Sequence, residues 1–259
     1  MNVDQRIIEK IVRKVGTYLA DNYGKAIKQH LIDGTHYDTI HDKIASDIYQ
    51  KDLAKYYPDI QFYSEEFKDH IDATKPYWII DPIEGTTNFA RNIPFFATQI
   101  AYVESNIVIC SAVYLPILQE LYTATRGKGA YCNGVKISVG SVANLNQAVV
   151  NVGKGTGVDN LTWWGNTMSH LAPLTRTNRL YGSTGIDICY VASGKLDLHI
   201  NHGSHNYDYA PGSLIAEEAG ASVTNFSGKN WQLTDSDIVI SNTKLVKELF
   251  TRCIPLITK

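Results

Sequence analysis

The most informative stretch of the chain is WIIDPIEGTTNF, residues 78–89. It begins as an apolar run typical of a buried strand, and the run ends in an acid, Asp81. A second acid, Glu84, follows three residues later, and Gly85 after it permits a sharp turn. The hydroxylated residues that come next suit the first turn of a helix, whose unpaired N–H groups can hold an anion. The stretch therefore predicts two carboxylates beside amide donors, which suits a metal-bridged phosphate.

Each acid of this stretch also has a simpler explanation. Asp81 and Glu84 could be ordinary turn and capping acids, because Asp-Pro commonly opens turns and acids favour helix N-termini. A buried strand, two acids, a turn glycine and a hydroxyl cluster in this order are more specific than any one of these features. We therefore favour the metal and phosphate interpretation.

Length and composition indicate a folded protein with a sizeable core. The 259 residues admit two compact domains or one large α/β domain. Hydrophobic residues make up 44% and charged residues 19%, against about 45–50% and about 25% in ordinary globular proteins. The 24 basic and 26 acidic residues give a net charge of −2, which disfavours a nucleic acid polymer or an anionic membrane as partner. Any phosphate must be bound locally.

Cysteine usage and hydropathy favour a soluble, cytoplasmic protein. The four cysteines, at positions 110, 132, 189 and 253, form no CxxC pair and lack structural-zinc spacing. The N-terminal apolar residues repeat with a period near 3.6, which predicts an amphipathic helix ending near Gly24 and not a signal peptide. The longest apolar stretch, residues 107–118, is interrupted and falls short of the ~20 residues of a membrane span.

The apolar pattern differs between the two halves of the chain. In the first half it predicts a helix ending near Gly24, a polar loop at 33–39 and a second helix that ends before Pro58. Strands of an antiparallel sheet follow at 77–80, 99–103, 107–114 and 120–124. In the second half it predicts strands at 148–152, 179–181, 196–200, 222–225 and 237–241 and helices at 163–171, 186–192, 209–219 and 244–251. We divide the chain into an α+β domain, 1–140, and an α/β domain, 141–259.

Three motifs connect the chain to a known family. Residues 81–89, DPIEGTTNF, resemble the D-P-[IL]-D-G-[ST]-x-N-[FY] signature of the inositol monophosphatase family, and only Glu84 departs from it, where the family has Asp. Residues 64–66, SEE, are similar to the family's G-E-E, and residues 207–212, YDYAPG, to its W-D-x-A-[AG]-G. Weaker similarities at 126–130 and 217–220 extend the likeness over most of the chain. The chain thus resembles a family of magnesium-dependent, lithium-sensitive phosphatases.

The resemblance implies a fold and an assembly. The expected fold is the sugar-phosphatase fold, an α/β fold with an α+β N-terminal half and an α/β C-terminal half. Its helices and sheets are layered as an α-β-α-β-α sandwich, with the active site between the halves. The first domain carries most metal ligands, and the second carries Asp208 and the specificity residues. Because family members commonly form dimers, the resemblance also implies a homodimer.

The resemblance further implies the residues of the site. Metal ligands are expected to be Glu65, Asp81, the backbone carbonyl of Ile83, Glu84 and Asp208, an oxygen set that suits two or three Mg²⁺ ions. Asp42 and Thr86 are expected to orient and activate the attacking water. The phosphate is expected at the N–H groups of Gly85, Thr86 and Thr87, and the alcohol part of the substrate at Gly182, Ser183, Thr184 and Asn201.

Several of these residues, when each is considered alone, have a simpler interpretation. Glu65 could be a solvated acid, and Asp208 could cap a helix that follows it. Asp42 could be the N-cap of the second helix, and we weigh that role equally with the chemical one. Only the presence of all the motifs in the family's order favours the metal-binding and catalytic roles over these alternatives.

Two departures from the family pattern bear on function. The added methylene of Glu84 moves its carboxylate by about 1.5 Å, and such sites tolerate only ~0.5 Å of error unless the backbone compensates. Asn201 stands where inositol phosphatases usually carry Glu, so it accepts fewer hydrogen bonds from sugar hydroxyls.

We expect hydrolysis of inositol monophosphate or a related sugar or nucleotide phosphate. The alternatives are NADP(H) 2′-phosphatase, 3′-nucleotidase or fructose-1,6-bisphosphatase activity and, in another class, a non-catalytic protein that binds a phosphorylated metabolite.

Two other motifs do not lead to a function. His199, His202 and His205 form HxxHxxH, but neither a strand nor a helix brings all three to one side, so we expect a polar loop and not a zinc site. Residues 153–157, GKGTG, are followed by Val158 where a dinucleotide-binding GxGxxG needs its third glycine, so we expect no Rossmann site.

Overall fold

The structure of the protein is a computed structural model that describes residues 3–25, 30–32, 36–67, 70–155 and 157–257. Its helices are α1 (Gln5–Asn22), α2 (Ile40–Tyr56), α3 (Thr86–Ala90), α4 (Val158–Leu171), α5 (Thr184–Ala192), α6 (Asn206–Glu218), α7 (Thr243–Arg252) and α8 (Ile254–Ile257), with 3-10 turns at Leu145–Gln147 and Ala172–Leu174.

The strands form two mixed sheets and a small hairpin. The larger sheet has the order β3 (Gln61–Ser64), β4 (Tyr77–Glu84), β5 (Ala97–Glu104), β6 (Ile107–Leu115), β7 (Glu120–Thr125), β8 (Ala130–Cys132) and β9 (Val135–Lys136). The smaller sheet has the order β11 (Thr177–Arg179), β10 (Val149–Val152), β12 (Leu198–His202), β14 (Asp237–Ser241) and β13 (Ser222–Thr224). The hairpin pairs β1 (His30–Ile32) with β2 (His36–Asp38). In the larger sheet only β3 and β4 run parallel, whereas β10 runs parallel to both of its neighbours.

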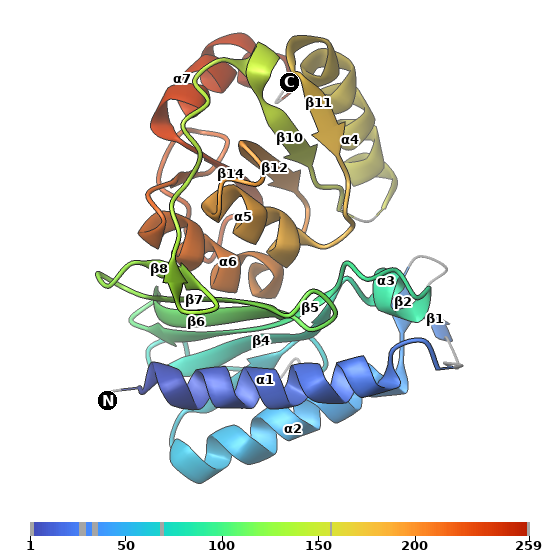
Figure 1. Cartoon of the computed structure of the whole chain (residues 1–259), viewed down its shortest axis with the longest axis vertical. Helices are drawn as coiled ribbons and strands as arrows, with labels where there is room; N and C mark the ends of the chain where they lie inside the picture. Colours follow the sequence, from blue (N-terminus) through green and yellow to red (C-terminus); the bar gives the residue numbers. More distant parts are fainter. Residues whose placement is uncertain (1–2, 26–29, 33–35, 68–69, 156, 258–259) are drawn as a thin grey trace.

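The elements stack in five layers (Figure 1). Helices α1 and α2 cover the outer face of the larger sheet, and α5 and α6 lie between the two sheets. Helices α4 and α7 cover the outer face of the smaller sheet. The α-β-α-β-α sandwich expected from the resemblance is therefore confirmed.

Strand β4 shows how the sequence specifies these layers. Its apolar side chains alternate between faces: Trp78 and Ile80 belong to the core under α1 and α2, and Tyr77 and Ile79 belong to the core around α5 and α6. A strand buried on both faces reads as an uninterrupted apolar run, as this one does. The alternation also directs Asp81, the next residue on the Tyr77 side, toward the middle layer of helices.

Four local expectations are wrong. The hairpin β1–β2 lies between the first two helices, so a sheet precedes the second helix, and residues 36–38 of the expected polar loop form a strand; residues 33–35 lie outside the described residues. The larger sheet is mixed, because the short strand β3, which was not predicted, runs parallel to β4. The strand expected at 179–181 is β11, which ends at residue 179. The helix expected from residue 209 begins earlier, at Asn206, and contains Asp208.

The two sheets are built from consecutive parts of the chain. All strands of the larger sheet end by Lys136, and all strands of the smaller sheet begin from Val149 onward. The division at residue 140 remains a prediction. Among the described residues, no helix is long and apolar enough to span a bilayer. All four cysteines are free.

Candidate active site

A bulge in β4 brings its two acids to the same side of the sheet. Residues three apart in a regular strand face opposite ways. Here the pairing with β5 shifts register between Asp81 and Glu84, and Pro82 within the shift cannot donate to the ladder. The side chain of Asp81 stabilises the bulge, because its Oδ1 accepts the N–H of Ile83 at 3.1 Å. Both carboxylates therefore face the middle layer.

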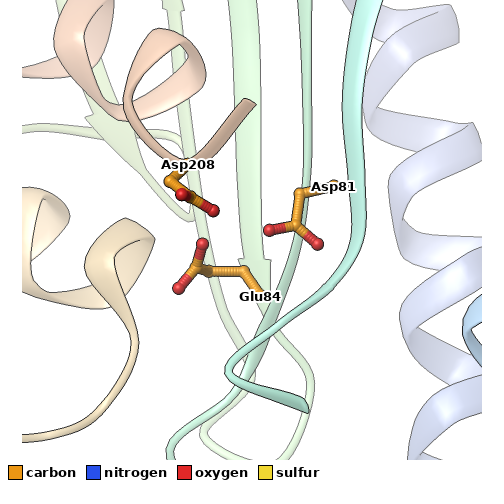
Figure 2. Close-up of side chains that lie close together, drawn as sticks. All are labelled: Asp81, Glu84 and Asp208. Carbon is orange, nitrogen blue, oxygen red and sulfur yellow. The ribbon is translucent and has the colours of Figure 1, made fainter. Parts of the chain in front are cut away.

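The third acid of the cluster comes from the other half of the chain. Asp208 is the third residue of α6, and its Oδ2 accepts the N–H of His205, the residue before the helix, at 2.6 Å. This bond belongs to the capping box of α6 and directs the carboxylate toward β4. Figure 2 shows Asp208 facing Asp81 and Glu84, and ligand atoms of the three side chains lie within 4.8 Å of one another.

Glu65 lies beside this cluster but outside its tightest group. It follows β3, and its N–H donates to the carbonyl of Ile80 at 3.2 Å, which places it next to the end of β4. Burial, and after it the charge of Asp208, raise the pKa of Glu65 from its ordinary 4.5 to about 8. Parallel pairing of β3 with β4 thus adds a fourth acid to the site.

The electrostatics of the cluster favour a bound cation. Burial and then the charges of its neighbours Glu65, Glu84 and Asp208 raise the pKa of Asp81 well above its ordinary value. Burial raises the pKa of Glu84 as well, and burial with the charge of Glu84 raises that of Asp208. Carboxylates held this close cannot all ionise without a compensating positive charge. The donors are all oxygens, so the residues fit Mg²⁺, a hard cation, better than zinc, which favours His and Cys.

Asp42 and Thr86 lie within hydrogen-bonding distance of each other. The hydroxyl of Thr86 is 3.3 Å from Asp42 Oδ1 and 2.8 Å from the carbonyl oxygen of Ile83, and it can donate its single hydrogen to only one of them at a time. The other carboxylate oxygen of Asp42 accepts the N–H and hydroxyl of Thr39 at 2.9 and 2.6 Å. Thr39 and not Asp42 is the N-cap of α2. Asp42 thus serves the capping box and contacts Thr86 as well.

The turn after Glu84 brings the start of α3 against the second half of the chain. Gly85 has a φ of +88° and precedes the helix. A Cβ on Gly85 would lie 3.1 Å from the Cβ of Ser183 and 3.3 Å from the carbonyl oxygen of Gly182, so only glycine fits without displacement. Thr87, the third residue expected at the phosphate, is exposed on α3.

Thr184 and Asn201, expected at the substrate alcohol, are in contact with each other. Asn201 is buried on β12, and its Nδ2 donates to Thr184 Oγ1 at 3.2 Å. The amide oxygen of Asn201 accepts the hydroxyls of Tyr209 at 3.1 Å and Ser204 at 3.3 Å. With its amide used in this way, Asn201 can influence a ligand chiefly through Thr184.

The motif of three histidines does not form a cluster. His199 is fully buried on β12, where its Nδ1 lies 2.9 Å from Asn151 Oδ1 and burial lowers its pKa to about 3. His202 lies 3.1 Å from the amide oxygen of Asn160, and His205 precedes α6. Within the described part of the chain, the histidines belong to no group suited to a metal.

Two buried polar residues of the site were not identified from the sequence. Gln99 on β5 donates from Nε2 to the carbonyl of Tyr207 at 2.9 Å and lies 3.3 Å from Glu84 Oε2. Asn88 on α3 donates to the carbonyls of Phe95 at 2.6 Å and Tyr181 at 2.7 Å. For Gln99 the available signal was a polar residue within an apolar strand that is otherwise buried on both faces.

Comparison with known proteins places this chain in a family. The model of the inositol monophosphatase family matches residues 3–257. Inositol monophosphatase 1 of Solanum lycopersicum is 35% identical over 83% of this chain and 81% of its own. The Nus factor SuhB of Salmonella typhimurium is 31% identical over 94% and 92%. The fructose-1,6-bisphosphatase/inositol-1-monophosphatase of Thermotoga maritima is 32% identical over 90% and 89%.

Solved structures agree with this result. The IMPase of Thermotoga maritima superposes with a TM-score of 0.88 at 31% identity, covering 96% of this chain and 95% of its own. An IMPase/NADP phosphatase in complex with Mg²⁺ and phosphate superposes with a TM-score of 0.83 at 25% identity, covering 95% and 93%.

Proposed function

This chain belongs to the inositol monophosphatase family, and from that premise we propose that it is a magnesium-dependent phosphatase of a small phosphorylated metabolite. The observation that carries the proposal is the group formed by the buried carboxylates of Asp81 and Glu84 and the half-buried carboxylate of Asp208, whose ligand atoms lie within 4.8 Å of one another. Such a group is costly to bury unless a cation binds to it.

The metal would be held by the acids of the cluster. Asp81, Glu84 and Asp208 are the proposed ligands, with Glu65 and the carbonyl of Ile83 completing the set for two or three ions. When bound, Mg²⁺ would neutralise charge on the phosphoryl group and lower the pKa of water.

Thr86 and Asp42 are the proposed catalytic residues. When the carbonyl of Ile83 is engaged elsewhere, the Thr86 hydroxyl donates to Asp42, and its lone pairs are left to accept a hydrogen bond from water. That water is thereby oriented, and Asp42 can take the proton that Thr86 passes on.

The substrate would lie across the seam between the two halves. The N–H groups of Gly85, Thr86 and Thr87 are the proposed phosphate donors, since the first turn of a helix leaves such groups without intrahelical acceptors. Residues 182–184 would contact the alcohol part, with Asn201 acting through Thr184.

The substrate class is a sugar or nucleotide phosphate. Inositol monophosphate is the first candidate, because several relatives bear inositol monophosphatase names. The names of other relatives keep fructose 1,6-bisphosphate and NADP(H) as alternatives, and a 3′-nucleotide completes the set. A homodimer and a cytoplasmic location are part of this proposal.

Release of inorganic phosphate tests the function. The chain should release phosphate from at least one of inositol 1-phosphate, NADP, 3′-phosphoadenosine 5′-phosphate and fructose 1,6-bisphosphate in the presence of Mg²⁺, and excess EDTA should stop the reaction. Asp208→Asn is the matched variant, because an amide oxygen can still accept the N–H of His205 while the negative charge is lost. Equal rates for wild type and Asp208→Asn, independent of Mg²⁺, would overturn the proposal.

A second candidate is a protein that binds a phosphorylated metabolite without hydrolysing it. The departure of Glu84 from the family's Asp favours it, and one relative bears the name Nus factor and not that of a phosphatase. Calorimetry with the same four compounds separates the candidates, since binding in Mg²⁺ without phosphate release would support the second one.

A further inference from the structure

Glu84 contacts both halves of the molecule through one carboxylate. Its Oε1 accepts the N–H of Thr184, the first residue of α5, at 2.7 Å. Its Oε2 lies 3.3 Å from Gln99 Nε2, within the larger sheet. The carboxylate also lies beside Asp81 and Asp208 in the acid cluster (Figure 2).

The surrounding structure leaves room for this side chain. Gly185 packs against it, since a Cβ on Gly185 would lie 3.2 Å from Glu84 Cγ and 2.5 Å from Gln99 Oε1. The hydroxyl of Ser183 lies 3.4 Å from the carbonyl oxygen of Glu84, so the main chain is joined to the same segment. The glutamate is only 6% exposed, so water competes little with these contacts.

The length of the side chain decides the contact with α5. Shortening it by one methylene withdraws the carboxylate by about 1.5 Å. A 2.7 Å hydrogen bond lengthened by that amount is no longer formed. The family's aspartate at this position therefore cannot make the bond in this backbone, whereas glutamate can.

We propose that Glu84 is a positioning residue that couples metal binding to the substrate segment, residues 182–184. Oε1 accepts the N–H of Thr184 at the start of α5, which would leave Oε2 available to hold the metal. This inference rests on the proposed function for the roles of the metal and of residues 182–184. The bond between Glu84 and Thr184 is present in the structure regardless of turnover.

Two substitutions separate the two roles of the carboxylate. Glu84→Asp keeps the charge for the metal but cannot reach Thr184. Glu84→Gln keeps an oxygen that can accept the N–H of Thr184 but removes the charge. The matched control is Glu218→Asp, since Glu218 also accepts backbone N–H groups across the two halves, those of Gly127 and Gly129 at 2.7 Å each, away from the acids.

The readout is amide hydrogen exchange of Thr184 with and without Mg²⁺, together with calorimetry of Mg²⁺ binding. In wild type, Mg²⁺ should slow the exchange of Thr184. In Glu84→Asp, exchange of Thr184 should be at least about tenfold faster than in wild type. This variant should still bind Mg²⁺, but Mg²⁺ should not change the exchange rate of Thr184. In Glu84→Gln, protection without metal should stay within about threefold of wild type, and Mg²⁺ binding should be weakened at least tenfold. Glu218→Asp should match wild type at Thr184.

The proposal is overturned if Glu84→Asp leaves the exchange of Thr184 unchanged, or if Mg²⁺ has no effect on it in wild type. Where phosphate release is measurable, Glu84→Asp should raise KM several-fold and change kcat less, because the defect lies in placing residues 182–184. Absence of turnover in wild type would count against the proposed function alone, since the exchange and calorimetry results would still decide the coupling.

Discussion

At the scale of single residues, the site depends on hydrogen bonds in which one donor has more than one acceptor. The Thr86 hydroxyl has one hydrogen and two acceptors within reach, Asp42 and the carbonyl of Ile83. A residue so placed can switch its donor bond without moving its backbone.

We expect Thr86→Ala to lower kcat about 10²-fold or more, because the variant loses the group that orients water, and general acid–base contributions are of that order. Thr86→Ser should retain most of the activity, since it keeps the hydroxyl. Steady-state kinetics on the preferred substrate measures both. Thr251→Ala is the control, because Thr251 is exposed and its hydroxyl donates to the carbonyl of Lys247, one turn earlier in the same helix. A similar loss in that variant would contradict the assignment.

The pKa of Glu65 predicts how stability depends on pH in the absence of metal. The folded state raises this pKa from 4.5 to about 8, so it binds more protons than the unfolded state between these values. The contribution is fully present below pH 4.5 and is lost as the pH rises through about 8. Asp81 and Asp208 shift in the same direction.

Denaturant unfolding in EDTA should therefore give a free energy that falls from pH 5 to pH 8.5. Glu65→Gln should flatten this slope, because its amide does not titrate. A free energy that rises over this range in the wild-type protein would contradict the prediction.

At the scale of elements, the site depends on the bulge in β4 and the turn that follows it. The bulge places Asp81 and Glu84 on one face, and Gly85 lets α3 start directly against residues 182 and 183. In a regular strand Asp81 and Glu84 would face opposite sides of the sheet. With a longer loop after Glu84, α3 would not contact residues 182 and 183.

We expect Gly85→Ala to destabilise the protein more than Gly127→Ala does. Both glycines have positive φ, +88° and +76°, so both variants incur about 1–2 kcal/mol of backbone strain. At Gly127 a Cβ meets nothing within 4 Å, whereas at Gly85 it meets Ser183 and two carbonyl oxygens. Thermal unfolding of the two variants gives the comparison, and equal losses would show that contact at the seam adds nothing.

At the scale of the whole molecule, the acid cluster joins two halves that carry separate sheets. Asp81 and Glu84 lie on the larger sheet, and Asp208 lies in the first turn of α6, in the middle layer. A cation bound to all three would bind the folded state and not the unfolded chain. Its binding free energy would add to the stability of both halves.

Mg²⁺ should therefore stabilise the protein, by about 2.7 kcal/mol at a concentration one hundred times its Kd. Thermal unfolding across an Mg²⁺ titration at pH 7.5 measures this effect, and Asp208→Asn should reduce it strongly. An unfolding temperature unaffected by Mg²⁺ in the wild-type protein would contradict a metal bound by all three acids.

The sequence and its resemblance to the family predicted the layers of the fold and the candidate residues of the site. Apolar periodicity located most helices and strands, because burial of one face repeats every 2 or 3.6 residues. The motif at residues 81–89 identified Asp81, Glu84 and Thr86 as candidates, because the order of acid, turn and hydroxyl is local to one segment. Short strands such as β1, β2 and β3 were missed, since three or four residues carry too little periodicity.

Only the tertiary structure decided which of these groups meet. The contact between Glu84 and Thr184 joins residues 100 positions apart, and the contact between Gln99 and Asp208 joins residues 109 positions apart. No local pattern encodes such contacts, because they depend on how two separately built sheets pack against one layer of helices. The sequence marked Glu84 as a departure from its family, and the tertiary structure placed the N–H of Thr184, at the start of α5, within reach of the longer side chain's carboxylate.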